Sequence, residues 1–493
     1  MNKQIIITRT SGNLFFRTVS PVALYPAVFF FMVCGFRSLG QVNNAAGRKF
    51  VISDILIEGN RKTLNSIILR ELTFKKGDTI AASLWHNLAE RSEENLRNTS
   101  LFTTMPMVDT VRMKNGETDV YIQVQERWYI WPAPIFKVEE RNFNTWWQQD
   151  NHRLDKADLG GTLTMYDVLG LNQTLSLIAQ LGYTKELGFS YRIPYINKKQ
   201  AGGLAFSFNY TENNELPYTS VNGILTYLDY PGQILQHTYK GKVQYTYRQG
   251  LYNTHIFEAD ILSTAISDTI RALTKDYLPF NLSSATIPEV KYYFKSDYRD
   301  CTPYPLRGYF FDISLNDYGM GLKLNNTPYN LFYVQSSFHK YWSLSPLFYY
   351  SVEAEGKVSQ AGAQPYFLQR GMGYSNSFVR GYELYVVDGN YYALTKNELR
   401  FRLINRPMQT IPYLGVRQFN TTFFTIYLTA FSDWGYVGAP YPYVINNFLS
   451  KTPLWGNGAG IDLVTYYDIV FRIEYSFNNL GQGGVFIHFM APM

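Results

Sequence analysis

The chain contains 493 residues, of which 46% are hydrophobic, including 41 Tyr and 34 Phe. Its mean hydropathy is nevertheless −0.19, and no run of about 18 apolar residues argues for a transmembrane helix. Without residues 1–40, the 45 basic residues fall to 41 against 39 acidic ones, so the net charge drops from +6 to +2 and nothing points to nucleic acid. The aromatic content suits either a soluble β-sandwich or a barrel of transmembrane strands with aromatic girdles.

Residues 1–40 predict a secretory signal peptide. Basic residues lead into a short apolar run at residues 22–33, and the small residues Ser38 and Gly40 precede a plausible cleavage site. After cleavage Cys301 is the one cysteine left, so we expect no intramolecular disulfide. An exported chain without a membrane helix is periplasmic, secreted or an outer-membrane barrel.

Residues 48–127 predict a small α+β domain, because strand-like and helix-like patterns follow one another within about 80 residues. The predicted elements are a strand at 50–57, a helix capped by Thr63, a helix over 81–98, and strands at 107–113 and 120–125 around the hairpin signal Asn115-Gly116. This order places both helices on one face of a sheet.

Residues 128–493 follow a different pattern, in which apolar and polar residues alternate. Near the end, for example, Ile473 and Tyr475 alternate with Arg472 and Glu474. Charged residues on the polar side suit a wet lumen better than the dry core of a sandwich. We therefore predict an all-β transmembrane barrel of about 16 antiparallel strands, since each strand needs about 9–11 residues to cross a membrane.

Several short motifs resemble those of a known family. Residues 48–127 look like a POTRA domain, the polypeptide-transport-associated module, in element order and in Ile57-Glu58-Gly59-Asn60. The remainder resembles the BamA/TamA-type outer-membrane protein assembly and translocation family (bacterial surface antigen type) in five motifs: Asp300 with Tyr304-Pro305-Leu306-Arg307-Gly308, Val379-Arg380-Gly381-Tyr382-Glu383, Glu398-Leu399-Arg400, Phe431-Ser432-Asp433-Trp434-Gly435 and Gly456-Asn457-Gly458-Ala459-Gly460. The resemblance implies a 16-stranded barrel in the bacterial outer membrane, with one POTRA domain in the periplasm.

The resemblance places Val379, Arg380, Gly381 and Tyr382 on a lid loop folded into the barrel. A poorly solvated guanidinium is costly unless carboxylates pair with it. Glu398 and Asp433 are the expected partners, because the resemblance implies that both face the lumen, and one planar guanidinium can bridge two carboxylates. The alternative is an exposed Arg380 that makes no contact.

The two ends of the barrel sheet form a second candidate site, the seam. The last strand is expected at Gly484, Val485, Phe486, Ile487, His488 and Phe489, and its partner across the seam within residues 157–166. An edge with unpaired N–H and C=O groups can template a client strand by β-augmentation. The glycines before the last strand either weaken its pairing or only form a turn.

We expect no enzyme, because the six histidines show no metal-ligand spacing and no nucleophile elbow or phosphate-binding loop occurs. Catalytic residues, metal and cofactors are accordingly predicted to be absent. The predicted function is insertion or translocation of unfolded outer-membrane or secreted polypeptides, with periplasmic or lipoprotein accessory subunits and outer-membrane lipid as further partners. A passive, porin-like channel is the alternative, and general assembly factor and dedicated transporter are not separated.

Overall fold

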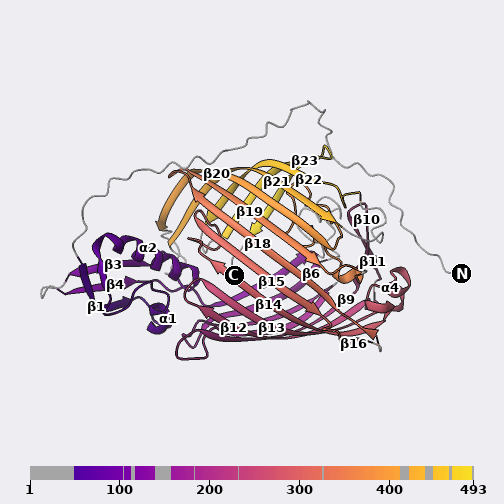
Figure 1. Cartoon of the computed structure of the whole chain (residues 1–493), viewed down its shortest axis with the longest axis horizontal. Helices are drawn as coiled ribbons and strands as arrows, with labels where there is room; N and C mark the ends of the chain where they lie inside the picture. Colours follow the sequence, from indigo (N-terminus) through magenta and orange to yellow (C-terminus); the bar gives the residue numbers. More distant parts are fainter. Residues whose placement is uncertain are drawn as a thin grey trace.

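The N-terminal domain of the computed structural model packs two helices against one sheet (Figure 1). Its elements are β1 (Lys49–Glu58), α1 (Asn65–Leu69), β2 (Thr79–Ala81), α2 (Ala82–Asn98), β3 (Met107–Arg112) and β4 (Thr118–Gln123). The sheet order is β2-β1-β4-β3, with β1 parallel to β4. Alternate residues of β1 and β4, among them Ile52, Val120 and Ile122, are fully buried against Ile68 and Leu96 of the helices.

The structure describes residues 49–490 apart from 104, 113–116, 139–156, 183, 231, 325–326, 363, 411–420, 439–447 and 466–468. The predicted signal peptide (residues 1–40) and the Asn115-Gly116 hairpin signal lie outside the described residues. None of the described helices is long and apolar enough to cross a membrane.

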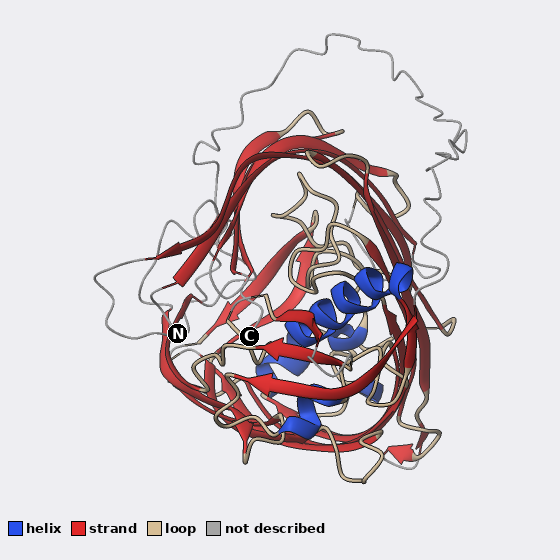
Figure 2. Ribbon diagram, turned by 90° about the vertical axis from the view of Figure 1, so that its left-hand side faces the viewer, coloured by secondary structure: helices blue, strands red, loops and turns tan. Residues whose placement is uncertain are grey.

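The second part of the chain is a 16-stranded antiparallel sheet that curls round into a barrel (Figure 2). Its strands are β5 (Ile130–Val138), β6 (Ala157–Val168), β7 (Gln173–Leu181), β8 (Thr184–Ile193), β9 (Gly202–Asn213), β12 (Gln236–Gln249), β13 (Asn253–Ile266), β14 (Ser284–Asp297), β15 (Gly308–Tyr318), β18 (Leu331–Ser343), β19 (Phe348–Ser359), β20 (Tyr391–Thr410), β21 (Thr421–Gly438), β22 (Leu454–Thr465), β23 (Ile469–Asn478) and β24 (Gly483–Met490). Short elements lie in the loops at the end away from the N-terminal domain: β10 (Glu215–Val221), β11 (Ile224–Asp229), α4 (Asp268–Leu273), η2 (Pro279–Asn281), β16 (Lys323–Leu324), β17 (Thr327–Pro328) and η3 (Tyr366–Leu368). The fold-class prediction is confirmed.

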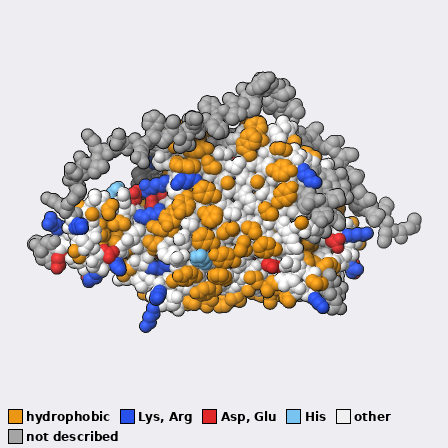
Figure 3. Space-filling view, viewed as in Figure 1, with side chains coloured by type: hydrophobic (Ala, Val, Ile, Leu, Met, Phe, Trp, Pro, Cys, Tyr) orange, Lys and Arg blue, Asp and Glu red, His pale blue; other side chains and the backbone are white. Residues whose placement is uncertain are grey.

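Alternation along the strands separates an apolar outer face from a polar interior. In β23, Ile473 and Tyr475 are exposed on the outside, whereas Arg472 and Glu474 point inward and are largely or fully buried. Orange apolar side chains cover much of the barrel wall seen in Figure 3. Because a strand's side chains alternate between its two faces, this pattern repeats in each strand without any long apolar run.

The first strand of the barrel differs from the expectation. We expected the partner across the seam within residues 157–166, but these lie in β6, and β5 precedes it. Pro132 and Pro134 obscure the strand pattern of β5. Proline is tolerated there because β5 is an end strand of the described sheet.

The two prolines also define the chemistry of that edge. The Tyr166 N–H donates to the Tyr129 carbonyl at 2.7 Å, so the odd-numbered residues of β5 pair with β6. Because backbone groups alternate sides along a strand, the even-numbered residues point to the seam. Pro132 and Pro134 therefore leave the seam edge of β5 without two N–H donors while keeping its carbonyl acceptors.

The N-terminal domain docks against the turns at one end of the barrel. The Arg248 guanidinium donates to both carboxylate oxygens of Glu71, at 2.6 and 2.7 Å, and Arg70 Nε donates to the Gln200 carbonyl at 2.7 Å. Thr63 does not cap α1, because its hydroxyl instead contacts Tyr129 and donates to Asp167 at 2.8 Å. The residue predicted as a helix cap is thus part of the interface between the domain and the barrel.

Replacing Arg248 with Ala is expected to loosen this docking. The change leaves the buried Glu71 carboxylate without its bidentate partner, which should cost about 1–3 kcal/mol. Hydrogen–deuterium exchange of residues 65–72 should rise in Arg248→Ala. It should stay unchanged in Arg271→Ala, whose side chain lies on α4 in a loop at the other end of the barrel. Equal exchange in both variants would show that Glu71 does not hold the interface.

Candidate functional site

The lid loop, residues 360–390, connects β19 to β20 and folds back into the barrel. Val379 and Tyr382 are buried, at 1% and 2% exposure, in an apolar cluster with Leu454 of β22. Gly381 has a φ of +92°, which glycine adopts without strain, and the Tyr382 hydroxyl donates to Asn479. These contacts hold the loop against the inner wall.

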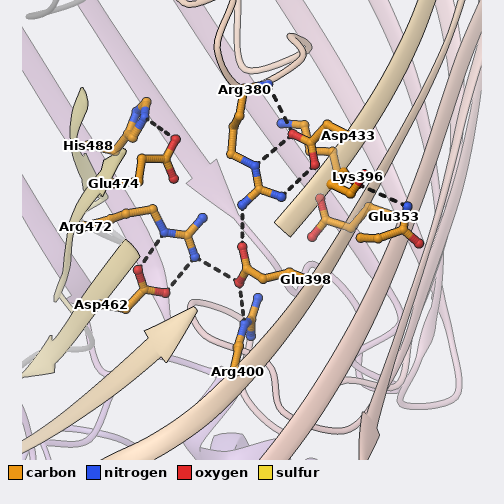
Figure 4. A network of polar contacts seen from close by, with 12 residues as sticks. Glu353, Arg380, Lys396, Glu398, Arg400, Asp433, Asp462, Arg472, Glu474 and His488 are labelled. Carbon is orange, nitrogen blue, oxygen red and sulfur yellow. Dashed lines mark hydrogen bonds and ion pairs between the residues drawn. The ribbon is translucent and has the colours of Figure 1, made fainter. Parts of the chain in front are cut away.

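Arg380 lies between the two carboxylates expected from the sequence (Figure 4). Its Nε and Nη2 donate to the two oxygens of Asp433 at 2.8 and 2.7 Å, and its Nη1 donates to Glu398. The guanidinium also lies 3.8 Å from the centroid of the Phe431 ring, a cation–π contact. Burial lowers the pKa of Arg380, but the hydrogen bonds and charge of Asp433, together with the charge of Glu398, outweigh it, so the pKa is raised and the group stays a cation.

The pair belongs to a larger set, here named the charge cluster: Arg380, Glu398, Arg400, Asp433, Asp462 and Arg472 (Figure 4). Glu398 also accepts from Arg400 at 2.6 Å and from Arg472 at 3.1 Å. Arg472 donates to Asp462 across the β22–β23 pair at 2.7 and 2.6 Å. Three guanidinium groups thus balance three carboxylates, which keeps six buried charges compatible with a poorly solvated interior.

A glycine of β22 makes room for the lid loop. A Cβ atom at Gly456 would lie 1.7 Å from the Arg380 carbonyl oxygen. Only a residue without a side chain allows this approach of two backbones. Gly456, the first residue of the glycine-rich motif at residues 456–460, therefore allows the lid loop to dock against β22.

The loop between β14 and β15 links the charge cluster to the N-terminal domain. Arg400 donates to the Pro305 carbonyl at 2.8 Å, and the Tyr304 hydroxyl donates to Asp462 at 2.8 Å. At the loop's other side, Arg307 donates to Glu90 and Glu94 of α2. Buried and part-buried polar contacts therefore run from the lid loop to the N-terminal domain.

Asp300 shapes this loop from within. Its carboxylate accepts the backbone N–H groups of Cys301, Leu306 and Arg307, at 2.9, 3.0 and 3.3 Å. Burial raises the pKa of Asp300, and these three donors partly oppose the shift. Within the motif at residues 300–308, Asp300 therefore stabilises the fold of the loop. Arg307 binds α2 of the N-terminal domain.

The strand expected at residues 484–489 lies in β24, which pairs with β23 at the end of the sheet. Val485 and Phe489 are exposed on the outer face, while Phe486 is buried. His488 points inward and contacts Glu474 at 3.2 Å. Gly484 pairs with Ser476 and Ile487 with Ile473 of β23. β5 and β24 are thus the two end strands of the described sheet, and they define the seam.

Sequence reasoning did not assign Arg400, Asp462, Arg472 or Tyr304 to the site. A signal existed for two of them: Arg400 follows Glu398 by two residues and so shares its face of β20, and Arg472 stood on the polar face of β23. Asp462 and Tyr304 carried no such signal, because their partners come from other strands and from a loop.

The comparisons with known proteins identify the N-terminal domain. The POTRA family profile, described as "Surface antigen variable number repeat", matches residues 50–127. No curated protein matches the chain.

Three solved structures are similar to the chain. BamA from Haemophilus ducreyi lacking POTRA domains 1–3 is 14% identical, with a TM-score of 0.47 over 90% of this chain and 85% of the other. CdiB from Escherichia coli is 11% identical, with a TM-score of 0.47 over 91% and 92%. CdiB from Acinetobacter baumannii is 13% identical, with a TM-score of 0.44 over 87% and 70%.

The profile match and the observed fold together define the class of protein. The chain is a POTRA domain followed by a 16-stranded antiparallel β-barrel. This arrangement of one POTRA domain before a barrel is the one expected from the sequence.

Replacing Gly456 with Ala is expected to displace the lid loop. The added methyl group would overlap the Arg380 carbonyl, and such overpacking costs about 1–3 kcal/mol. Protease sensitivity of residues 370–390 should increase, with the barrel still folded as judged by its heat-modifiable gel mobility. Gly241→Ala in β12 is the matched control, since a Cβ there meets nothing within 4 Å. An equally protected lid in both variants would contradict the docking role of Gly456.

Replacing Arg380 with Lys is expected to release the lid although the charge is kept. An ammonium group cannot make the bidentate contact to Asp433 and reach Glu398 as well, so at least one buried carboxylate loses a partner, at a cost of about 1–3 kcal/mol. Amide exchange across residues 376–386 should rise. Arg402→Lys, on the same strand as Glu398 but outside the charge cluster, should leave it unchanged. Unaltered exchange in Arg380→Lys would mean that the apolar contacts alone hold the loop.

Proposed function

We propose that this protein inserts polypeptides into the outer membrane or translocates them across it, without catalysing a chemical reaction. In this proposal the POTRA domain lies in the periplasm and receives an unfolded outer-membrane or secreted polypeptide. The apolar outer face of the barrel contacts outer-membrane lipid. The lid loop closes the lumen until a client engages.

The observation that carries the proposal is the run of polar contacts from Arg380 on the lid loop, through Glu398, Arg400 and Pro305, to the loop that binds α2 of the POTRA domain. A passive pore needs an open lumen and no connection to a docking domain. Here a buried charge cluster and the lid loop occupy part of the interior. The arrangement therefore favours a protein whose interior responds to the domain that binds clients.

The seam supplies the proposed mechanism of insertion. Pro132 and Pro134 remove two donors from the edge of β5, so a complete ladder between β5 and β24 cannot form. A weakened seam is easier to open, and an open strand edge can template an incoming strand. β3 is an end strand of the POTRA sheet and offers a second edge, for a client or for a periplasmic or lipoprotein accessory subunit.

Depletion of the protein followed by an outer-membrane proteome tests the proposal. Loss of many barrel proteins would indicate a general assembly factor, and loss of a single cargo a dedicated transporter. Arg380→Ala and Glu398→Ala should fold but fail to restore the proteome, whereas Arg402→Lys should restore it. An unchanged proteome would refute both roles, and solute-selective conductance of the purified protein would then favour a porin-like channel.

A further inference from the structure

Three ionisable side chains outside the charge cluster meet where the lid loop touches the last two strands. They are Glu383 of the lid loop, Glu474 of β23 and His488 of β24, and one ligand atom from each lies within 4.8 Å of the others. His488 Nε2 lies 3.2 Å from Glu474 Oε1 and 4.0 Å from Glu383 Oε1. No metal site was expected from the sequence, because the six histidines show no metal-ligand spacing. The three residues of this trio are 91 and 14 positions apart in the chain.

The trio brings two carboxyl groups and one imidazole together beside the charge cluster. Glu383 accepts the backbone N–H of Gly381 at 2.8 Å through its Oε2. The neighbouring cations Arg380 and Arg472 pair with Asp433, Glu398 and Asp462, so Glu383 and Glu474 are two buried carboxyl groups outside that balanced set. Such a pair of buried carboxylates is stabilised when a cation lies between them.

One atom of the trio has hydrogen-bonding capacity to spare. Glu474 is 1% exposed, and its Oε1 contacts His488, whereas its Oε2 has no hydrogen-bond partner in the part of the chain that the structure describes. A buried carboxylate oxygen without a donor is costly unless a ligand satisfies it. The trio therefore contains a buried oxygen, Glu474 Oε2, that could accept a contact from a ligand.

The donor set and its access fit a divalent metal ion. Imidazole nitrogen with carboxylate oxygens is a ligand set for zinc and similar transition metals, which bind these atoms at about 2.0–2.2 Å. Ligand atoms around such an ion lie roughly 3–3.5 Å apart. His488 Nε2 and Glu474 Oε1 already have this separation, at 3.2 Å, and Glu383 would move closer to both to complete the set. A cavity of about 130 Å³, lined by lid-loop residues such as Tyr374 and Asn376 and by Glu383 and His488, leads to the trio.

We propose that Glu383, Glu474 and His488 form a binding site for a divalent transition-metal ion, of the zinc class, that ties the lid loop to the last two strands of the barrel. Glu383 comes from the loop, Glu474 from β23 and His488 from the seam strand β24. A bound ion therefore joins the lid and the seam in one contact. Metal occupancy holds both closed, and loss of the metal frees them.

Metal binding is measured on the untagged full chain in detergent, after removal of metals with a chelator and dialysis against Zn²⁺. We expect about one Zn²⁺ per chain by elemental analysis. His488→Ala, Glu474→Gln and Glu383→Gln should each raise the dissociation constant at least about tenfold, since even outer-shell changes cost about 10–100-fold. His255→Ala is the matched control, because that imidazole contacts Tyr292 and lies outside the trio.

Glu383→Gln guards against a folding defect, because it changes the loop and leaves every barrel strand intact. In the wild-type chain Zn²⁺ should lower amide exchange of residues 376–386 and of β24 together, and in Glu383→Gln it should lower neither. Absence of stoichiometric Zn²⁺, or binding that all three variants retain, would overturn the proposal. Binding needs no client, so this outcome is independent of whether the proposed role in polypeptide insertion is correct.

Discussion

The position of the lid loop inside the barrel depends on one buried guanidinium. Arg380 lies inside the barrel wall, where an unpaired cation would be untenable, and it is held there by Asp433 and Glu398. Its partners sit on neighbouring strands, so their spacing is fixed by the sheet rather than by side-chain flexibility. The position of the lid loop is fixed in turn, because its Arg380 guanidinium must lie between the Asp433 and Glu398 carboxylates.

The balanced charges extend this constraint to the rest of the barrel. Glu398 also accepts from Arg400 and Arg472, so the lid loop, the four strands β20 to β23 and the loop containing Pro305 share one set of buried contacts. Removing any one of these side chains leaves an oppositely charged partner buried without compensation, so the contacts of the charge cluster depend on one another. The POTRA domain enters through Arg307 and Arg248, at the same end of the barrel. The lid, the lumen and the POTRA domain are therefore physically connected, and the proposed role in handling polypeptides rests on this connection.

The seam contrasts with this rigid interior. The edge of β5 at the seam presents carbonyls but lacks two donors, and β24 at the other end of the sheet carries His488 on its inner face beside Glu474. The lid loop contacts this last strand through the neighbourhood of Glu383 and His488. Strands β20 to β23 are cross-linked by the charge cluster, whereas β24 and β5 lie at the ends of the described sheet. The proposed metal ion would act at the border between the two.

The sequence by itself determined the class of architecture and the central pair. Alternation around Arg472 and Glu474 specified the barrel and which face of the strand is polar and points inward, because side-chain direction along a strand has a period of two residues. The structure buries these charges among paired side chains rather than in open water. The family resemblance of the motifs around Arg380 pointed to Glu398 and Asp433 as its partners, and the cost of an unpaired buried guanidinium agreed with that choice. The tertiary structure alone decided that β5 is the first strand, that Thr63 serves docking rather than a helix cap, and that Glu383, Glu474 and His488 meet. Those contacts join segments far apart in the chain, and their distances follow from strand register and barrel closure, which no local pattern encodes.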